Sequence, residues 1–138
     1  MSTSSHKLKI LVIDDNKEST TTISEFLRVH EFEVVVTNDS MEGLEHIRQE
    51  NYDIVFLDIN LPVISGLGII ELLSLENNLK NQNIFVFPED YISQIELKKL
   101  LKREGIKGFL KKPINFDELL SVISSNSHKK LPKLDISN

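Results

Sequence analysis

Apolar residues along the chain fall into two alternating kinds of segment. Short runs of four to six residues, rich in β-branched and aromatic side chains, are typical of strands buried in a parallel sheet. The longer segments between them carry apolar residues three or four positions apart, the spacing of one helix face. The pattern predicts strands at residues 8–13, 33–37, 54–57, 84–87 and 107–110, each followed by a helix.

The predicted helices each have an apolar stripe and, in most cases, a recognisable end. The stripes are Ile23, Phe26 and Leu27, continued by His30; Met41, Leu44 and Ile47; Leu67, Ile70 and Leu73, with the neighbouring Leu72; Ile92, Ile95, Leu97, Leu100 and Leu101; and Phe116, Leu119, Leu120 and Ile123. Residues suited to begin or cap a helix precede three of them, at Asn16-Lys17-Glu18-Ser19, at Asn38-Asp39-Ser40 and at Asn115. Gly105 is expected to stop the fourth helix, because glycine commonly terminates helices.

This alternation predicts an α/β fold of the (βα)5 type, a doubly wound parallel sheet covered by helices on both faces. A flavodoxin-like strand order of 2-1-3-4-5 would place the first and third strands side by side. With 138 residues the chain is long enough for one domain with a full core. We expect that domain at residues 8–126, a disordered N-terminal tail at 1–7, and a polar tail or linker stump at 127–138.

Composition and charge narrow the class of protein. The chain is 40% hydrophobic and 27% charged, which is ordinary for a soluble globular protein. Its net charge of −5 argues against nonspecific binding of nucleic acid. It has no cysteine and no apolar run near the roughly 18 residues that a membrane span requires. The start of the chain lacks the apolar centre of a signal peptide, so we expect a cytoplasmic protein without a membrane partner.

Acidic residues end two of the predicted strands. Asp14 and Asp15 follow the first strand, and Asp58 follows the apolar run of the third. A single aspartate at such a position is more often a turn or cap residue. Three carboxylates at one edge of a sheet, however, repel one another strongly unless a cation lies between them. The sequence therefore predicts a divalent-cation site, and Lys112 after the fifth strand would approach it from the other side.

These residues, in this order on this pattern, resemble the receiver domain of two-component response regulators, and more particularly its chemotaxis-regulator-like members. The likeness covers roughly residues 8–126. It is carried by the acidic pair Asp14-Asp15, the Leu-Asp-x-x-x-Pro-x-x-x-Gly stretch from Leu57 to Gly66, and Lys112-Pro113. Each motif alone is weak evidence, but together they are specific.

The resemblance implies a role for each matching residue. Asp58 would be the phosphoacceptor, and Asp14 and Asp15 would hold Mg²⁺ together with Asp58 and the backbone carbonyl of Asn60. Lys112 would contact the phosphoryl group, and the peptide bond before Pro113 would be cis. The residue types agree with these roles, because phosphoryl transfer depends on positioning and charge neutralisation. The alternative for Lys112 is a solvated surface lysine.

The chain departs from the family's pattern after the fourth strand. The family has a Thr or Ser there, whose hydroxyl binds the phosphoryl group when the domain switches. Counting forward from Asp58 places Pro88 at this position, whereas counting back from Lys112 places Asp90 there, which implies two extra loop residues. Neither residue has a hydroxyl. The next one along the chain is Ser93, for which helix capping is the simpler explanation.

Phe109 lies where the family often has a switch aromatic residue that changes rotamer on activation. As an apolar residue of the fifth strand, it is equally explained as part of the core or of a partner surface. The sequence leaves these alternatives open.

The resemblance implies a signalling phosphoacceptor rather than an enzyme, with at most self-phosphorylation and self-dephosphorylation. Its partners would be a sensor histidine kinase or phosphotransfer protein and a downstream protein target. The signal would leave through the face formed by the fourth helix, the fifth strand and the fifth helix, which could also form a homodimer. The sequence names neither kinase nor output, and leaves open whether the chain is free-standing or part of a longer protein.

Two other functions are compatible with parts of the pattern. A degenerate receiver would act as a protein-interaction module that responds little to phosphorylation, and Pro88 favours it. A Mg²⁺-dependent phosphatase on a related sheet would need a second acid two residues after the nucleophile, where this chain has Asn60. The intact set of Asp14, Asp15, Asp58 and Lys112 favours the phosphoaccepting receiver.

Overall fold

The computed structural model describes residues 7–88 and 92–126. Within them the chain alternates between five strands and five helices, as the hydrophobic pattern predicts. The strands are β1 (Lys9–Ile13), β2 (Glu33–Thr37), β3 (Ile54–Asp58), β4 (Ile84–Phe87) and β5 (Ile106–Phe109). The helices are α1 (Lys17–Val29), α2 (Ser40–Gln49), α3 (Gly66–Leu75), α4 (Gln94–Leu101) and α5 (Phe116–Asn126).

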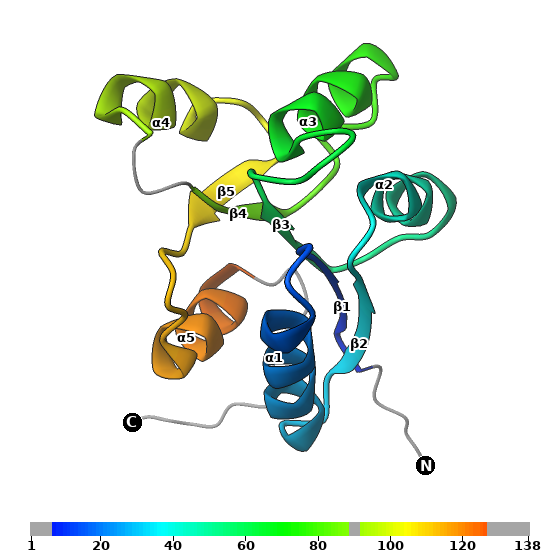
Figure 1. Ribbon diagram of the computed structural model, residues 1–138, viewed down its shortest axis with the longest axis vertical. Coiled ribbons are helices and arrows are strands. Elements are labelled where there is room, and N and C mark those ends of the chain that lie inside the picture. The colour runs from blue at the N-terminus through cyan, green and yellow to red at the C-terminus, as the bar shows by residue number, and fades with distance from the viewer. Residues whose placement is uncertain (1–6, 89–91, 127–138) are drawn as a thin grey trace.

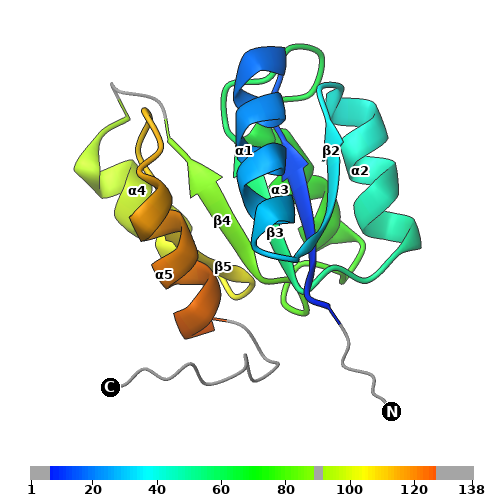
Figure 2. The ribbon, with the colours of Figure 1, turned by 90° about the horizontal axis from the view of Figure 1, so that it is seen from below.

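The strands form one parallel sheet in the order β2-β1-β3-β4-β5. Helices α1 and α5 cover one face of this sheet, and α2, α3 and α4 cover the other (Figure 1). The view from below shows α1 and α5 in front of the strands (Figure 2). The predicted α/β fold, its doubly wound sheet and its flavodoxin-like strand order are therefore confirmed.

Each face of the sheet has its own hydrophobic core, because neighbouring side chains of a strand point to opposite faces. In β1, Ile10 and Val12 pack with residues of α1 and α5, and Leu11 and Ile13 pack with residues of α2 and α3. All four side chains are fully buried. β3 lies in the middle of the sheet and is buried along its whole length, so its last residue is held on a rigid strand.

Side-chain caps fix where the helices begin. The side chain of Asn16 accepts a hydrogen bond from the backbone N–H of Ser19, and Asp39 caps α2 in the same way. Asn115 accepts from the N–H of Glu118 at the start of α5. Each of the three predicted capping segments therefore supplies a cap, through Asn16, Asp39 and Asn115.

The fourth helix is shorter than its apolar stripe predicts. Ile92 was expected in the helix, but α4 begins at Gln94 because Ser93 and Glu96 form a capping box. Ile95, also expected on the buried stripe, is 72% exposed, and Leu100 is the buried residue of α4. The helix ends at Leu101, ahead of Gly105, whose φ of 98° lies in the region that glycine favours.

Residues 1–6 and 127–138, which include most of the two predicted tails, lie outside the described residues. Within the described ranges, each helix is too short or too polar to cross a membrane.

Candidate functional site

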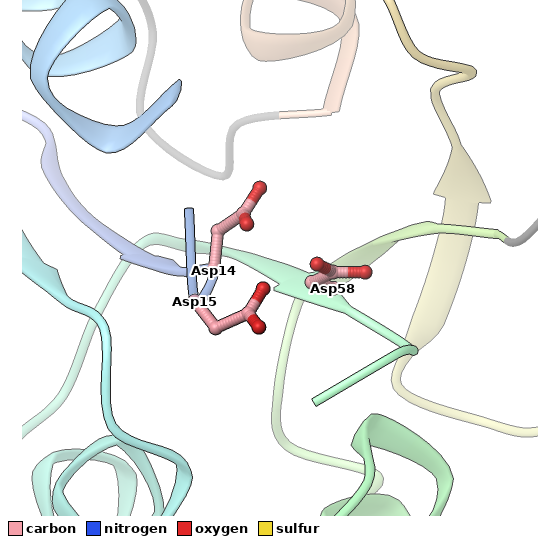
Figure 3. Close-up of side chains that lie close together, drawn as sticks. All are labelled: Asp14, Asp15 and Asp58. Atoms are coloured by element: carbon pink, nitrogen blue, oxygen red, sulfur yellow. The ribbon is translucent and has the colours of Figure 1, made fainter. Parts of the chain in front are cut away.

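The acidic residues predicted to meet do so at the carboxyl ends of β1 and β3. These strands are neighbours, with Ile13 paired to Leu57, so the next residues, Asp14 and Asp58, lie side by side. One carboxylate oxygen from each of Asp14, Asp15 and Asp58 lies within 4.8 Å of the others. Figure 3 shows the three side chains together at this edge of the sheet.

Asp14 and Asp58 are held in the same way. Both are buried, whereas Asp15 is exposed. Oδ1 of Asp14 accepts a hydrogen bond from the backbone N–H of Asn16 at 3.0 Å, and Oδ1 of Asp58 accepts one from the N–H of Asn60, also at 3.0 Å. In each case the donor lies two residues further along the chain, so the first turn after the strand fixes the carboxylate and leaves its second oxygen for other partners.

Lys112 lies between these two second oxygens. Its Nζ is 2.7 Å from Oδ2 of Asp14 and 3.3 Å from Oδ2 of Asp58, and it lies 5.5 Å from the centre of the Phe87 ring. Lys112 is therefore paired with both aspartates, although 36% of its side chain stays exposed; its contact with a phosphoryl group stays a prediction. The peptide bond between Lys112 and Pro113 is cis, as the resemblance implies.

The surroundings of Asp58 and Lys112 shift the pKa values of both side chains. Burial and the neighbouring charge of Asp14 raise the pKa of Asp58 to about 6, although the N–H of Asn60 and the charge of Lys112 favour its ionised form. Burial lowers the pKa of Lys112, but the close contact with Asp14 and the charges of both aspartates outweigh it, so that pKa is raised. At neutral pH Asp58 is therefore mostly ionised and Lys112 is charged.

Comparison with known proteins identifies the family of the chain. The family model described as the response regulator receiver domain matches residues 10–124. The chain belongs to this family. The receiver domain identified from the sequence, part of two-component signalling, is thus confirmed.

Two known relatives show the range of proteins that contain similar domains. The receiver domain is 32% identical over 123 residues to the CAI-1 autoinducer sensor kinase/phosphatase CqsS of Vibrio cholerae, covering 88% of this chain and 18% of that protein. It is 28% identical to the cell cycle transcriptional regulator CtrA of Caulobacter vibrioides, covering 84% of this chain and 48% of that protein. The chain thus spans less than two thirds of the length of either relative.

Solved structures share the fold. The chemotaxis protein CheY4 of Vibrio cholerae matches with a TM-score of 0.76 and 25% identity, over 88% of this chain and 99% of that one. The receiver domain of Ssk1 from Saccharomyces cerevisiae, crystallised with the histidine phosphotransfer protein Ypd1, matches with a TM-score of 0.78 and 21% identity, covering 94% and 95%.

Receiver domains bind Mg²⁺ at an acidic pocket, and the residues of this chain fit that ion. The site offers carboxylate oxygens, the ligands that Mg²⁺ prefers. Oδ2 of Asp14 is buried and has no aligned hydrogen bond among the described residues, so only the charge of Lys112 balances it. Asn60 lies two residues after Asp58, the last residue of β3, and is exposed. The role of its backbone carbonyl as a ligand of Mg²⁺ stays a prediction.

Pro88 directly follows β4, and its place at the position of the family's hydroxyl residue stays a prediction. Asp58 pairs with Phe87 across β3 and β4, and the N–H of Ile59 donates to the carbonyl of Phe87 at 3.2 Å. Pro88 comes next and is buried, which is compatible with counting forward from Asp58. Asp90, the other candidate position, lies outside the described residues. Ser93 caps α4, so its simpler explanation is correct.

Phe109 is the last residue of β5 and is 36% exposed. The interpretation of Phe109 as a core residue is therefore wrong. Its exposure is compatible with a switch aromatic residue or a partner surface, and both stay predictions.

The sequence did not reveal two side chains that brace the site. Nδ2 of Asn38 donates to the carbonyl of Asp14 at 2.8 Å and to Oγ1 of Thr20 at 3.0 Å. Oγ of Ser40 donates to the carbonyl of Pro62 at 3.0 Å. Both residues looked like ordinary capping chemistry before α2, because their partners lie 18 to 24 positions away in the chain.

Proposed function

We propose that this receiver domain accepts a phosphoryl group on Asp58 from the phosphohistidine of a sensor kinase or phosphotransfer protein. The observation that carries the proposal is the arrangement of Asp58 itself. It ends a central strand, one of its oxygens is fixed by the N–H of Asn60, and the other lies against Lys112 and beside Asp14.

The chemistry follows from this arrangement. A carboxylate oxygen of Asp58 attacks the phosphorus atom, forming an acyl phosphate as the bond between phosphorus and the donor's imidazole nitrogen breaks. The electron pair stays on that nitrogen, so a ring protonated on its other nitrogen leaves as neutral imidazole. A pKa of about 6 leaves Asp58 mostly ionised at neutral pH, the state that can attack.

Charge neutralisation is the other requirement of phosphoryl transfer. Lys112 supplies a compact positive charge 3.3 Å from Asp58 that can contact oxygens of the incoming group. Mg²⁺ held by Asp14, Asp15, Asp58 and the carbonyl of Asn60 would supply further positive charge to those oxygens. Three carboxylates and one lysine sum to −3 + 1 = −2, which one such ion balances.

A groove beside Lys112 gives the donor a place to dock. It lies between α1 and the segment that joins β5 to α5, and Ile23, Ile114 and Phe116 are among the residues that line it. The signal would leave through the face of α4, β5 and α5, which includes the exposed Phe109, toward a downstream protein or a second copy of the chain. We place this exchange in the cytoplasm.

Intact mass after treatment with acetyl phosphate and Mg²⁺ tests the proposal. The protein should gain roughly 80 Da, the mass of one phosphoryl group. Asp58→Asn should abolish the gain because an amide is a poor nucleophile. Asp117→Asn, the same change at an exposed aspartate of α5, should keep it. A gain that persists in Asp58→Asn would contradict the assignment.

The second candidate is a degenerate receiver whose interactions do not depend on phosphorylation. It is favoured by Pro88, which provides neither a hydroxyl nor a backbone N–H at the end of β4. If the unmodified chain gains no mass with acetyl phosphate and Mg²⁺, this candidate replaces the first.

A further inference from the structure

Val63, in the loop between β3 and α3, has a backbone conformation that its side chain disfavours. Its φ is 69°, in the left-handed region, which is an outlier for a β-branched residue. The N–H of Ile64 donates to the carbonyl of Pro62 at 2.9 Å, which closes a three-residue turn around Val63. Such a turn with a positive φ at its centre is rare and strained. Val63 is 88% exposed, so burial of its side chain does not offset this strain.

The hydroxyl of Ser40 holds both ends of this turn. Ser40 is the first residue of α2 and is only 3% exposed. Its Oγ donates to the carbonyl of Pro62 at 3.0 Å and accepts from the N–H of Ile64 at 3.2 Å. A serine hydroxyl has one donor and can accept as well. A single buried side chain therefore uses both functions on the two residues that flank Val63.

The clamped turn belongs to the same short segment as Asp58 and Asn60. Within that segment, the N–H of Gly66 donates to the carbonyl of Ile59 at 2.8 Å, and the N–H of Asn60 donates to Asp58. A Cβ atom on Gly66 would lie 2.3 Å from the carbonyl oxygen of Asp58, so the end of the loop packs directly on the start. The turn at Val63 is therefore linked to the end of β3 by the contacts of one short segment.

We propose that Ser40 is a positioning residue for the phosphoacceptor site. By holding the strained turn closed, it keeps Asp58 and Asn60 in the geometry that accepts a divalent cation. Without the hydroxyl, Val63 relaxes toward a negative φ and the loop moves away from α2. This inference rests on the proposed function, because it assumes that the cation binds at Asp58.

Magnesium affinity of Ser40→Ala tests the proposal, measured by NMR titration of backbone amides with MgCl2. We expect an affinity roughly tenfold weaker than that of the unmodified chain, the size seen when residues that support metal ligands are lost. Hydrogen exchange at the amide of Ile64 should become faster, because one of its two acceptors is gone. If Ser40→Ala does not fold, Ser40→Cys serves instead, because a thiol is only a weak donor and acceptor.

Ser65→Ala is the matched control. Ser65 lies at the other end of the same loop, and its hydroxyl accepts from the N–H of Gly68 at 3.0 Å to cap α3. Its loss should lower stability but leave the affinity for Mg²⁺ within about twofold of the original. Equal weakening in both variants would overturn the special role of Ser40.

Rescue by Val63→Gly separates positioning from a general structural role. Glycine adopts the left-handed conformation freely. In the Ser40→Ala background it should therefore restore most of the affinity for Mg²⁺, because the turn no longer needs to be held. No recovery, or an unchanged affinity in Ser40→Ala itself, would overturn the proposal. If the unmodified chain binds no Mg²⁺ and gains no phosphoryl group, the proposed function fails as well, which is a different result.

Discussion

Two aspartates on neighbouring strands, Asp14 and Asp58, each bend back on the turn that follows them. In each aspartate, one carboxylate oxygen accepts a hydrogen bond from the backbone N–H two residues further along the chain. Nζ of Lys112 lies against the other oxygen in both cases. The two buried carboxylates thus share one positive charge, that of the partly exposed Lys112, and the carboxylate of Asp15 lies nearby. The site therefore carries unbalanced negative charge that a divalent cation would relieve.

The first prediction concerns this charge. Mg²⁺ at a hundred times its dissociation constant should raise the free energy of unfolding by about 2.7 kcal/mol, because it binds the folded state. For a domain of this size, that corresponds to a rise in Tm of roughly 5–15 °C. Asp14→Ala should lose most of this rise in thermal melts with and without Mg²⁺. Glu104→Gln, a change at an exposed acid outside the cluster, should keep it; equal rises in both variants would contradict the site.

At the scale of elements, the hydrophobic pattern predicted the strands and helices well, because it reports which face of each element is buried. β2 and β4 have the predicted bounds. The pattern failed where local hydrogen bonds determine the first residue of a helix. Ile92 lies outside α4 because Ser93 and Glu96 form the cap, and Ile95 points to solvent. Met41 and Leu67, predicted on buried stripes, are exposed in the first turns of α2 and α3.

In the candidate site, too, the residues placed by the strands could be predicted from the sequence, whereas a contact that depends on loop hydrogen bonds could not. Asp14, Asp58 and Lys112 could be placed from the sequence, because each lies at or just after the end of a strand and the strand order brings the strand ends together. The clamp by Ser40 could not be placed, because its hydrogen bonds depend on how the loop between β3 and α3 folds back onto α2. Nothing in the local sequence indicates this contact.

The second prediction tests the packing between the start of α3 and the end of β3. A Cβ atom on Gly66 would lie 2.3 Å from the carbonyl oxygen of Asp58 and 2.7 Å from Cα of Ile59, both backbone atoms. Gly66→Ala should therefore lower the free energy of unfolding by about 1–3 kcal/mol, the usual cost of overpacking. Urea denaturation followed by circular dichroism measures it.

Gly68→Ala is the matched control on the same helix. The nearest atom to its added Cβ is Cγ2 of the Ile64 side chain, at 3.0 Å, which can move. Alanine is also the better helix former, by about 1 kcal/mol. This variant should be neutral or more stable. The proposed packing would be contradicted if the two substitutions changed stability equally.

At the scale of the whole molecule, a signal from Asp58 has to cross β4 to reach the exposed face of β5. β4 pairs with both neighbours, through Phe87 with Asp58 and through Val86 with Phe109. Pro88 follows β4, and we expect it to stand where the family has a hydroxyl that binds the phosphoryl group. A charge-assisted hydrogen bond of this kind contributes about 1.5–3 kcal/mol. Its loss weakens a two-state shift by roughly ten- to a hundredfold in population.

The last prediction is that phosphorylation and conformational response are separated in this chain. Lys112 lies against Asp58 and should contact the phosphoryl group, so the chemistry should survive, but without a hydroxyl at Pro88 we expect no contact that draws the phosphoryl group and the segment after β4 together. Phosphorylation, or a phosphate mimic with Mg²⁺, should leave most backbone amides of α4 and α5 nearly unshifted in NMR spectra. Pro88→Thr should enlarge these shifts by supplying the hydroxyl, whereas Pro88→Ala, which removes only the ring, should not. Large shifts that reach Phe109 and α5 in the unmodified protein would show that another group has taken over this role, and the degenerate receiver would then be excluded.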